Sequence, residues 1–172
     1  MIKKIVIAVV IIIVAAVGFF SLGGGQRLVF EIEDSPTFYI VGEDFYGSYN
    51  SNKLEALFFS AQQRSAELET SLVVLNYKSD TLSEGKIHQL IGIMSDQMPA
   101  EGDTSNVMVM GQGKYLTTMI NAHNLVMPKP EEVREQATEF ASKQNLRPDD
   151  LSIEIYKNER DLRIMFPLRA LN

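Results

Sequence analysis

One carboxylate in this sequence stands in the middle of a segment that reads as a buried strand. Glu154 lies early in the alternating run Leu151–Leu168, where apolar and polar residues take turns. A strand here would place Ser152, Glu154 and Tyr156 on one face. A carboxylate held in an apolar cleft favours binding of a cation, and a nearby aromatic ring adds cation–π attraction. The pattern therefore makes Glu154 and Tyr156 candidate ligand-binding residues.

The same carboxylate has a simpler candidate partner on the next strand. If the chain turns at Lys157–Arg160, Arg163 falls opposite Glu154 on the same face. The two would then form an exposed ion pair that adds little to stability, and the residues alone favour this interpretation. If Arg163 instead reached the cleft with Glu154, a zwitterionic or neutral ligand would fit better than a plain cation.

Other side chains that could contribute to a site are few. Tyr46 and Tyr49 flank Gly47 in a segment typical of a loop or bulge, and both are candidate ligand contacts, although tyrosines near strands more often pack in the core. The chain has no cysteine, and its two histidines, His88 and His123, show no metal-site spacing. Without a phosphate-binding glycine loop either, the sequence predicts no metal and no cofactor.

The composition narrows the classes of partner. The chain has 172 residues, a formal net charge of −6 and a pI near 5.0. No cluster of Lys and Arg is present, so a nucleic-acid surface is not expected. A small-molecule ligand and the membrane are the predicted partners, and a protein partner stays open.

An apolar segment at the start of the chain predicts a single membrane-spanning helix. Ile5–Leu22 carries no charge, and its 18 residues give a helix of about 27 Å, enough to cross a bilayer core. The alternative is a signal peptide cut near Ser21–Gly24. We expect residues 1–25 to form the anchor and a short flexible linker that ends in Gly23–Gly25.

The charges around this segment predict its orientation. Lys3 and Lys4 precede it and Arg27 follows it, which favours a cytoplasmic amino terminus. The rest of the chain would then lie in the periplasm or another extracytoplasmic space, as a single-pass membrane protein.

Residues 26–172 contain two copies of one strand-helix-strand-strand unit. The first copy covers about 37–94, with a helix over Lys53–Glu69 capped by Asn52, and the second covers about 107–168, with a helix that starts at Pro130. Aligning Tyr77 with Tyr156 places an apolar residue, Leu75, where the second copy has Glu154. Two such units predict an α+β fold, with one antiparallel sheet and both helices on one side, behind the transmembrane helix.

Three motifs in order resemble the GyrI-like, AraC-type effector-binding domain: YIVGEDFYGSY at 39–49, GQGKYL at 111–116 and IEIYKNERDLRIMFPL at 153–168. The resemblance implies two modules around a central ligand cleft. It implies that Glu154 and Tyr156 lie in that cleft, facing cationic aromatic ligands, and that Gly47 and Tyr49 match a Gly-x-Tyr motif. The second copy departs from the pattern, with Asn-Ala-His-Asn-Leu at 121–125.

These observations leave three functions open. The leading hypothesis is a membrane-anchored ligand-binding or sensor module that holds a small organic, cationic aromatic molecule near Glu154. The second is a small-molecule hydrolase in which Glu154 acts as a base beside Tyr156. The third is a protein-interaction domain with a vestigial cleft. A buried Glu154 with Arg163 turned away would favour binding or catalysis over the third function.

Overall fold

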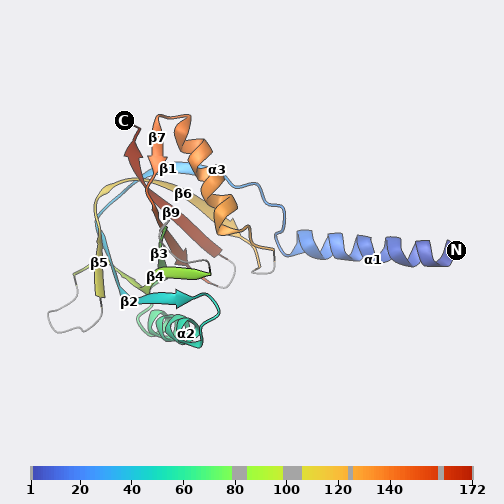
Figure 1. The fold of residues 1–172 in the computed structure, drawn as a ribbon, viewed down its shortest axis with the longest axis horizontal. Coiled ribbons are helices and arrows are strands. Elements are labelled where there is room, and N and C mark those ends of the chain that lie inside the picture. Colours follow the sequence, from blue (N-terminus) through green and yellow to red (C-terminus); the bar gives the residue numbers. More distant parts are fainter. Residues whose placement is uncertain (1, 79–84, 99–105, 124–125, 159–160, 172) are drawn as a thin grey trace.

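The computed structural model describes residues 2–78, 85–98, 106–123, 126–158 and 161–171, without the side chains of residues 2–6, 8 and 9. Part of the turn predicted at Lys157–Arg160 therefore lies outside the described residues. Figure 1 shows a long helix that projects from a body made of a curled sheet and two further helices.

The sheet is antiparallel throughout and runs in the order β1-β6-β9-β8-β3-β4-β2-β5, with β7 paired to β9. Its strands are β1 (Phe30–Ser35), β2 (Phe38–Ser48), β3 (Leu72–Tyr77), β4 (Lys86–Ser95), β5 (Asn106–Met110), β6 (Gly113–Asn121), β7 (Leu146–Pro148), β8 (Leu151–Tyr156) and β9 (Asp161–Ala170). The central pair, β3 and β8, joins the two halves of the chain. The predicted α+β fold with one antiparallel sheet is confirmed.

Two helices cover one face of this sheet, which we call the helix face. Helix α2 (Asn52–Glu67) packs on β2, β3 and β4, and its N-cap is Ser51, whose hydroxyl accepts from the Lys53 N–H at 3.2 Å. The cap predicted at Asn52 was therefore one residue late. Helix α3 (Pro130–Ser142) starts at Pro130 as predicted and buries Val133, Ala137 and Ala141.

The duplicated unit is also observed, with one correction to its alignment. The first copy is strand, helix, strand, strand, namely β2-α2-β3-β4, and the second is β6-α3-β8-β9 with the short strand β7 between α3 and β8. However, Tyr77 pairs with Leu151 and Leu72 pairs with Tyr156, so Tyr77 and Tyr156 point to opposite faces. Leu75 and Glu154, which the alignment made equivalent, likewise point to opposite faces, and the residue paired with Glu154 on β3 is Val74.

The other face of the sheet forms a second core without a helix. The sheet curls enough to bring Phe38 of β2 within 6.3 Å of Tyr115 of β6, measured between ring centroids. Strand β2 continues through Gly47, where the sequence predicted a loop or bulge. Gly42 and Gly92 face each other across β2 and β4, and an added Cβ on either would lie 2.2 Å from a backbone oxygen.

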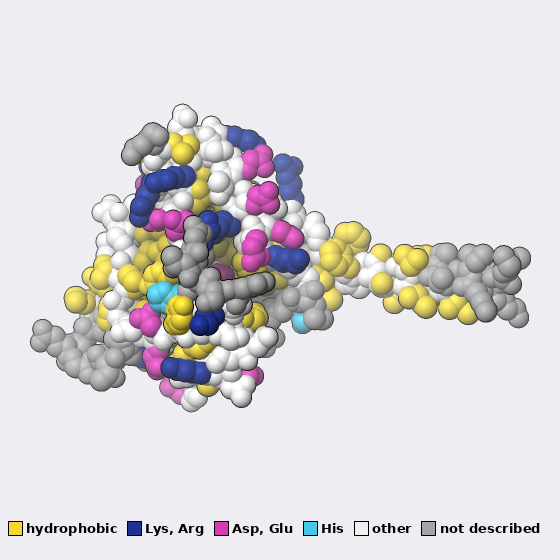
Figure 2. Space-filling model, in the orientation of Figure 1, with side chains coloured by type: hydrophobic (Ala, Val, Ile, Leu, Met, Phe, Trp, Pro, Cys, Tyr) yellow, Lys and Arg dark blue, Asp and Glu magenta, His cyan; other side chains and the backbone are white. Residues whose placement is uncertain are grey.

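Helix α1 (Ile2–Ser21) is the element that projects from the body, and its described side chains are mainly apolar and exposed (Figures 1 and 2). Within the part of the chain that the structure describes, no helix meets the combined length and hydropathy of a membrane span. The predicted span Ile5–Leu22 includes the side chains of residues 5, 6, 8 and 9, which lie outside that description.

The glycine linker after α1 is flanked by hydrogen bonds to the body. The His123 N–H donates to the Leu22 carbonyl at 2.9 Å, and the Asn121 N–H donates to Gln26 Oε1 at 3.4 Å. Gly23 has a φ of +86°, and a Cβ there would lie 2.5 Å from the Asn121 carbonyl oxygen. The residues on either side of Gly23–Gly25 are therefore bonded to the end of β6 and to the loop that follows it, a contact that the expectation of a flexible tether did not include.

Candidate functional site

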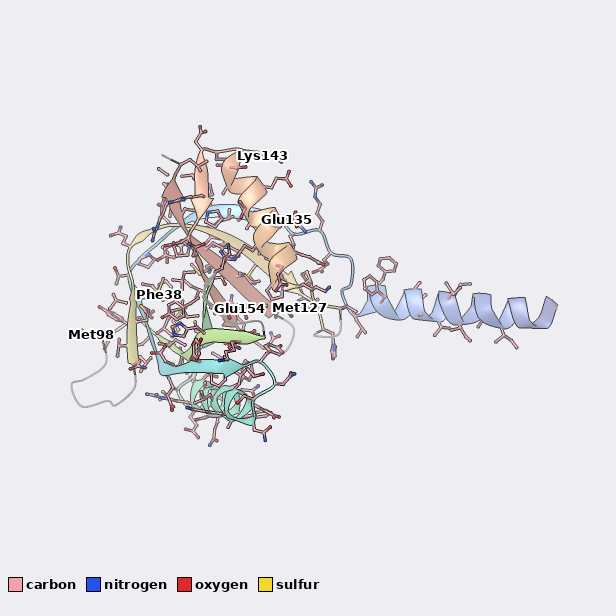
Figure 3. The ribbon with its side chains drawn as sticks, viewed as in Figure 1. Phe38, Met98, Met127, Glu135, Lys143 and Glu154 are labelled. Carbon is pink, nitrogen blue, oxygen red and sulfur yellow. The ribbon has the colours of Figure 1, made fainter. Side chains whose placement is uncertain are left out.

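Glu154 lies near the middle of the helix face of the sheet. Its strand, β8, is one of the two central strands, and its neighbours in register are Val74 on β3 and Ile164 on β9. In Figure 3 Glu154 appears inside the body, between α3 above and α2 below. The carboxylate is partly buried among apolar residues. The strand alternation that the sequence predicted thus places a charge between the two helices.

Neutral donors hold this carboxylate in place. The Tyr156 hydroxyl donates to Glu154 Oε2 at 2.6 Å, and the Asn76 amide donates to Glu154 Oε1 at 2.9 Å. Gln89 in turn donates to Asn76 Oδ1 at 2.5 Å, which orients the Asn76 amide so that its NH₂ group faces Glu154. The result is a polar chain across β4, β3 and β8, and it contains no positive charge.

The environment opposes ionisation of both acidic groups. Burial raises the pKa of Glu154 above its ordinary value, and the hydrogen bonds from Tyr156 and Asn76 offset part of that rise. Burial, followed by the nearby Glu154 charge, raises the pKa of the Tyr156 phenol. Tyr156 therefore stays a hydrogen-bond donor at neutral pH, and Glu154 takes up a proton more readily than an exposed glutamate does.

Arg163 does not neutralise Glu154. It pairs in register with Ile155 and points to the opposite face, where its guanidinium binds the carboxylate of Glu33 on β1. Thr117 donates to the other oxygen of Glu33 at 2.7 Å. The predicted cross-strand pair between Arg163 and Glu154 is therefore wrong, because the register of β8 and β9 differs by one residue from the one assumed.

Some of the predicted aromatic residues gather near Glu154. Tyr156 packs edge-on against Phe58 of α2, with ring centroids 5.7 Å apart and an interplanar angle of 88°. Tyr49 follows β2, is 69% exposed, and lies close enough to Tyr156 to contribute to the raised pKa of that phenol. These rings would supply an aromatic wall beside the carboxylate.

Tyr46 and Tyr77 lie elsewhere. Both stand on the face opposite the helices, where Tyr77 stacks on His88 at 4.3 Å and Tyr46 meets His88 edge-on at 6.3 Å. His88 Nε2 also lies 3.7 Å from Asp44 Oδ1. Tyr46 is thus separated from Glu154 by the sheet and is not brought into the site with it.

The sequence did not indicate several residues of the site. Asn76 and Gln89 are polar residues in otherwise apolar strands, and their positions relative to Glu154 depend on strand register, which the sequence leaves open. Phe58 lies in the helix predicted over Lys53–Glu69, but no sequence feature linked it to Glu154. The signal that could have indicated a shared hydrogen-bond network was one polar residue in each of two apolar strands, Asn76 in β3 and Gln89 in β4.

Comparison with known proteins supports the fold and leaves the family open. No protein-family model matches the chain, and no curated protein matches it. Among solved structures, the C-terminal domain of EcmrR has a TM-score of 0.61 at 10% identity, covering 84% of this chain and 99% of that one. SAV2435 bound to tetraphenylphosphonium has a TM-score of 0.50 at 15% identity, covering 83% and 95%.

A hydrolase from Listeria innocua is a third similar structure, with a TM-score of 0.57 at 10% identity, covering 84% of this chain and 94% of that one. At such identities the likeness concerns the fold alone. The neighbours are consistent with the GyrI-like fold that the sequence motifs suggested. The fold therefore occurs both in proteins with a bound small molecule and in a hydrolase.

Proposed function

We propose that this chain is a small-molecule binding module that holds a cationic aromatic ligand against Glu154. The observation that carries the proposal is a partly buried carboxylate without a counter-charge: within the described residues its hydrogen-bond partners are Asn76 and Tyr156, both neutral. A cationic ligand would supply the missing charge, and the rings of Tyr156 and Phe58 would add cation–π and apolar contact. The tetraphenylphosphonium in the similar structure SAV2435 is a ligand of this class.

We also propose that helix α1 anchors the module in a membrane. The sequence gives an uncharged segment from Ile5 to Leu22, and α1 continues as one helix of 20 residues, or about 30 Å. Large apolar side chains around the described part of α1 are 43–69% exposed. A lipid environment would cover these side chains, and the lysines before the segment favour a cytoplasmic amino terminus with an extracytoplasmic body.

The binding proposal is tested by isothermal titration of the full chain in detergent with tetraphenylphosphonium. Wild type should bind, and Glu154→Gln should lose at least about tenfold in affinity, which corresponds to about 1.4 kcal/mol. Glu43→Gln is the matched control, because Glu43 is an exposed carboxylate on the same face of the sheet. Equal affinity in wild type and Glu154→Gln would refute the assigned role of Glu154.

A hydrolase is the second candidate function. The observation in its favour is the 2.6 Å hydrogen bond between the Tyr156 hydroxyl and Glu154, a pair that could activate water and stabilise a leaving group. The structural neighbour from Listeria innocua carries the same fold. Release of a chromophore from activated aryl esters, present in wild type and absent in Glu154→Gln, would support catalysis, and equal release by both proteins would exclude Glu154 as the base.

A further inference from the structure

Gln89 of β4 is a polar residue with apolar neighbours on the helix face. It pairs with Phe45 on β2 and with Asn76 on β3, and Ile87 and Ile91 flank it on the same face of its own strand. Gln89 is partly buried. An apolar side chain would suit these neighbours without any polar atom to satisfy, so the amide at this position needs an explanation.

Gln89 is linked to Glu154 through one intermediate residue. Strand β3 lies between β4 and β8. Gln89 Nε2 donates to Asn76 Oδ1 at 2.5 Å, and Asn76 Nδ2 donates to Glu154 Oε1 at 2.9 Å. Both bonds run in the same direction, towards the carboxylate. In such a chain each bond polarises the next, so the bond from Gln89 makes the Asn76 NH₂ group a stronger donor to Glu154.

The orientation of the Asn76 amide favours one protonation state of Glu154. An ionised carboxylate only accepts hydrogen bonds and suits the NH₂ end of an amide, whereas a protonated carboxyl group donates and suits the oxygen end. The NH₂ end of Asn76 faces Glu154, and its oxygen accepts from Gln89. The chain from Gln89 therefore supports the ionised form and offsets part of the burial that raises the pKa of Glu154.

The ionisable groups around Glu154 leave this role to the amide chain. Within the part of the chain that the structure describes, the side chains that bond to Glu154 are Asn76 and Tyr156. The other charged or titratable groups on the surrounding elements have other neighbours: Arg163 of β9 binds Glu33, His88 of β4 lies near Asp44, Arg134 of α3 donates to the Asp149 carbonyl, Arg64 of α2 lines a hollow with Glu43 of β2, and Tyr49 acts on Tyr156.

We propose that Gln89 is a positioning residue that sets the charge selectivity of the site: by bonding to Asn76 it keeps an NH₂ group on Glu154, and so makes the site prefer a cation over a neutral molecule of similar shape. This inference rests on the proposed binding function and deepens it. Gln89 acts without contacting the ligand. Its replacement should therefore shift the pH at which cation binding becomes strong, and should leave the strongest binding unchanged.

The test uses tetraphenylphosphonium, whose charge does not change with pH, so that the pH dependence of its affinity reports on the protein. Isothermal titration of the full chain in detergent should show an affinity that rises with pH as Glu154 ionises and then levels off. Gln89→Met removes the amide and suits the apolar neighbours. Its curve should move to higher pH and reach the same plateau, with about fivefold weaker binding on the rising part, the effect expected of one hydrogen bond. Affinity for the neutral triphenylphosphine oxide should not fall.

Two further variants isolate the route of the effect. In an Asn76→Leu background, Gln89→Met should have no additional effect, because Gln89 acts through Asn76. Asn106→Leu is the matched control, since the Asn106 amide also donates to a carboxylate, that of Asp44, at 2.7 Å, but lies on the edge strand β5. This control should leave the pH curve unchanged.

The outcomes separate this inference from the binding function on which it rests. If Gln89→Met lowers the affinity for tetraphenylphosphonium equally at every pH, or leaves it unchanged, or still acts in the Asn76→Leu background, the role of Gln89 is refuted. The binding function survives each of these results when wild type binds and Glu154→Gln binds more weakly. If wild type does not bind tetraphenylphosphonium, or binds it no better than Glu154→Gln does, both are refuted.

Discussion

At the scale of single residues, the chain keeps a carboxylate where a neutral side chain would be more stable. Glu154 is surrounded by apolar residues and receives two neutral hydrogen bonds, so its ionised form lacks the charge partner that buried carboxylates usually have. The ion pair between Arg163 and Glu33 lies on the opposite face. An ionised carboxylate in an apolar environment destabilises the folded protein unless it is paired. Because no ion pair explains Glu154, a functional role is the interpretation that we favour.

The raised pKa of Glu154 predicts a pH-dependent stability. As pH rises above the ordinary glutamate value of 4.5, the folded protein holds the Glu154 proton longer than the unfolded chain does. The stabilisation that this group contributes is complete below 4.5 and is lost as pH rises through the raised pKa. Glutamine cannot ionise, so Glu154→Gln does not lose this stabilisation as pH rises. Its melting temperature should therefore exceed that of wild type by a margin that grows as pH increases towards neutral. Each unit of difference between the folded and unfolded pKa corresponds to about 1.4 kcal/mol.

Thermal melting of both proteins at a series of pH values measures this margin. Glu43→Gln, which removes an exposed carboxylate, should show no growth of this kind. If the difference in melting temperature between wild type and Glu154→Gln stayed constant with pH, the pKa of Glu154 would not be raised in the folded protein.

Replacing Tyr156 by phenylalanine should weaken cation binding through Glu154. The change removes the 2.6 Å hydrogen bond that stabilises the carboxylate and keeps the ring that packs on Phe58. The pKa of Glu154 should rise further, so less of the residue is ionised at neutral pH, and affinity for tetraphenylphosphonium should fall about threefold to tenfold. The affinity should recover as pH is raised, which a purely structural defect would not allow.

The control for this variant is Tyr77→Phe. Tyr77 has the same ring in a paired strand but stands on the opposite face against His88. Its replacement should leave the affinity unchanged at every pH. An affinity loss in Tyr156→Phe that high pH does not restore would argue that the phenol contacts the ligand directly.

The site could be predicted from the sequence only in part, for reasons visible in particular residues. Glu154 and Tyr156 emerge from strand alternation, because residues two apart share a face whatever the rest of the fold does. Arg163 was misplaced because the pairing of β8 with β9 depends on the length of the turn, and a slip of one residue reverses every side chain. Asn76 joins the site through the register of β3 against β8, which no local pattern encodes.

At the scale of elements, the close pairing of β2 with β4 depends on two opposed glycines. Gly42 and Gly92 pair across β2 and β4, where a Cβ on either would meet backbone atoms at 2.2 Å, far inside contact distance. A flexible side chain could move away from such a methyl group, but these backbone atoms cannot move without breaking the pairing of β2 with β4. The strands at this pair lie closer than a residue with a Cβ would allow.

Gly42→Ala and Gly92→Ala should each destabilise the protein severely. The added methyl group would force β2 and β4 apart and disturb the core of Phe38 and Tyr115 behind them, so we expect a loss of at least about 2 kcal/mol. Gly111→Ala is the control, because a Cβ at Gly111 has open space around it and the residue has no positive φ. Chemical denaturation of the three variants measures the effect, and a loss for Gly42→Ala no larger than for Gly111→Ala would contradict the packing argument.

The elements themselves were largely predictable, because periodicity is a local property. The alternating strands and the helix that starts at Pro130 lie where the pattern placed them. The short strand β7 was not predicted, since three residues are too few to show a periodic pattern. The curl of the sheet was also missed, because it follows from contacts between β2 and β6, which lie far apart in the sequence.

At the scale of the whole molecule, the junction after α1 fixes the helix relative to the body. The linker bonds to Asn121, the last residue of β6, and to His123 in the loop that follows, and Asn121 also donates to Asp161 at the start of β9. Asp161 follows the turn after Tyr156. The projecting helix and the Tyr156 end of the site therefore lie at the same end of the sheet, so a membrane around α1 would lie near that end.

The proposed topology can be tested without a background signal, because the chain contains no cysteine. A cysteine introduced as Glu55→Cys lies on the exposed side of α2 in the body, and one introduced as Lys3→Cys lies before the apolar segment. If α1 spans a membrane with its amino terminus in the cytoplasm, a membrane-impermeant maleimide should label Glu55→Cys in right-side-out vesicles and label Lys3→Cys only after permeabilisation. Labelling of Lys3→Cys alone in intact vesicles would reverse the orientation, because the charge bias of two lysines against Arg27 is small. Labelling of both variants without permeabilisation, with the protein recovered in the soluble fraction, would show that α1 does not cross the bilayer and that its apolar surface is covered in another way.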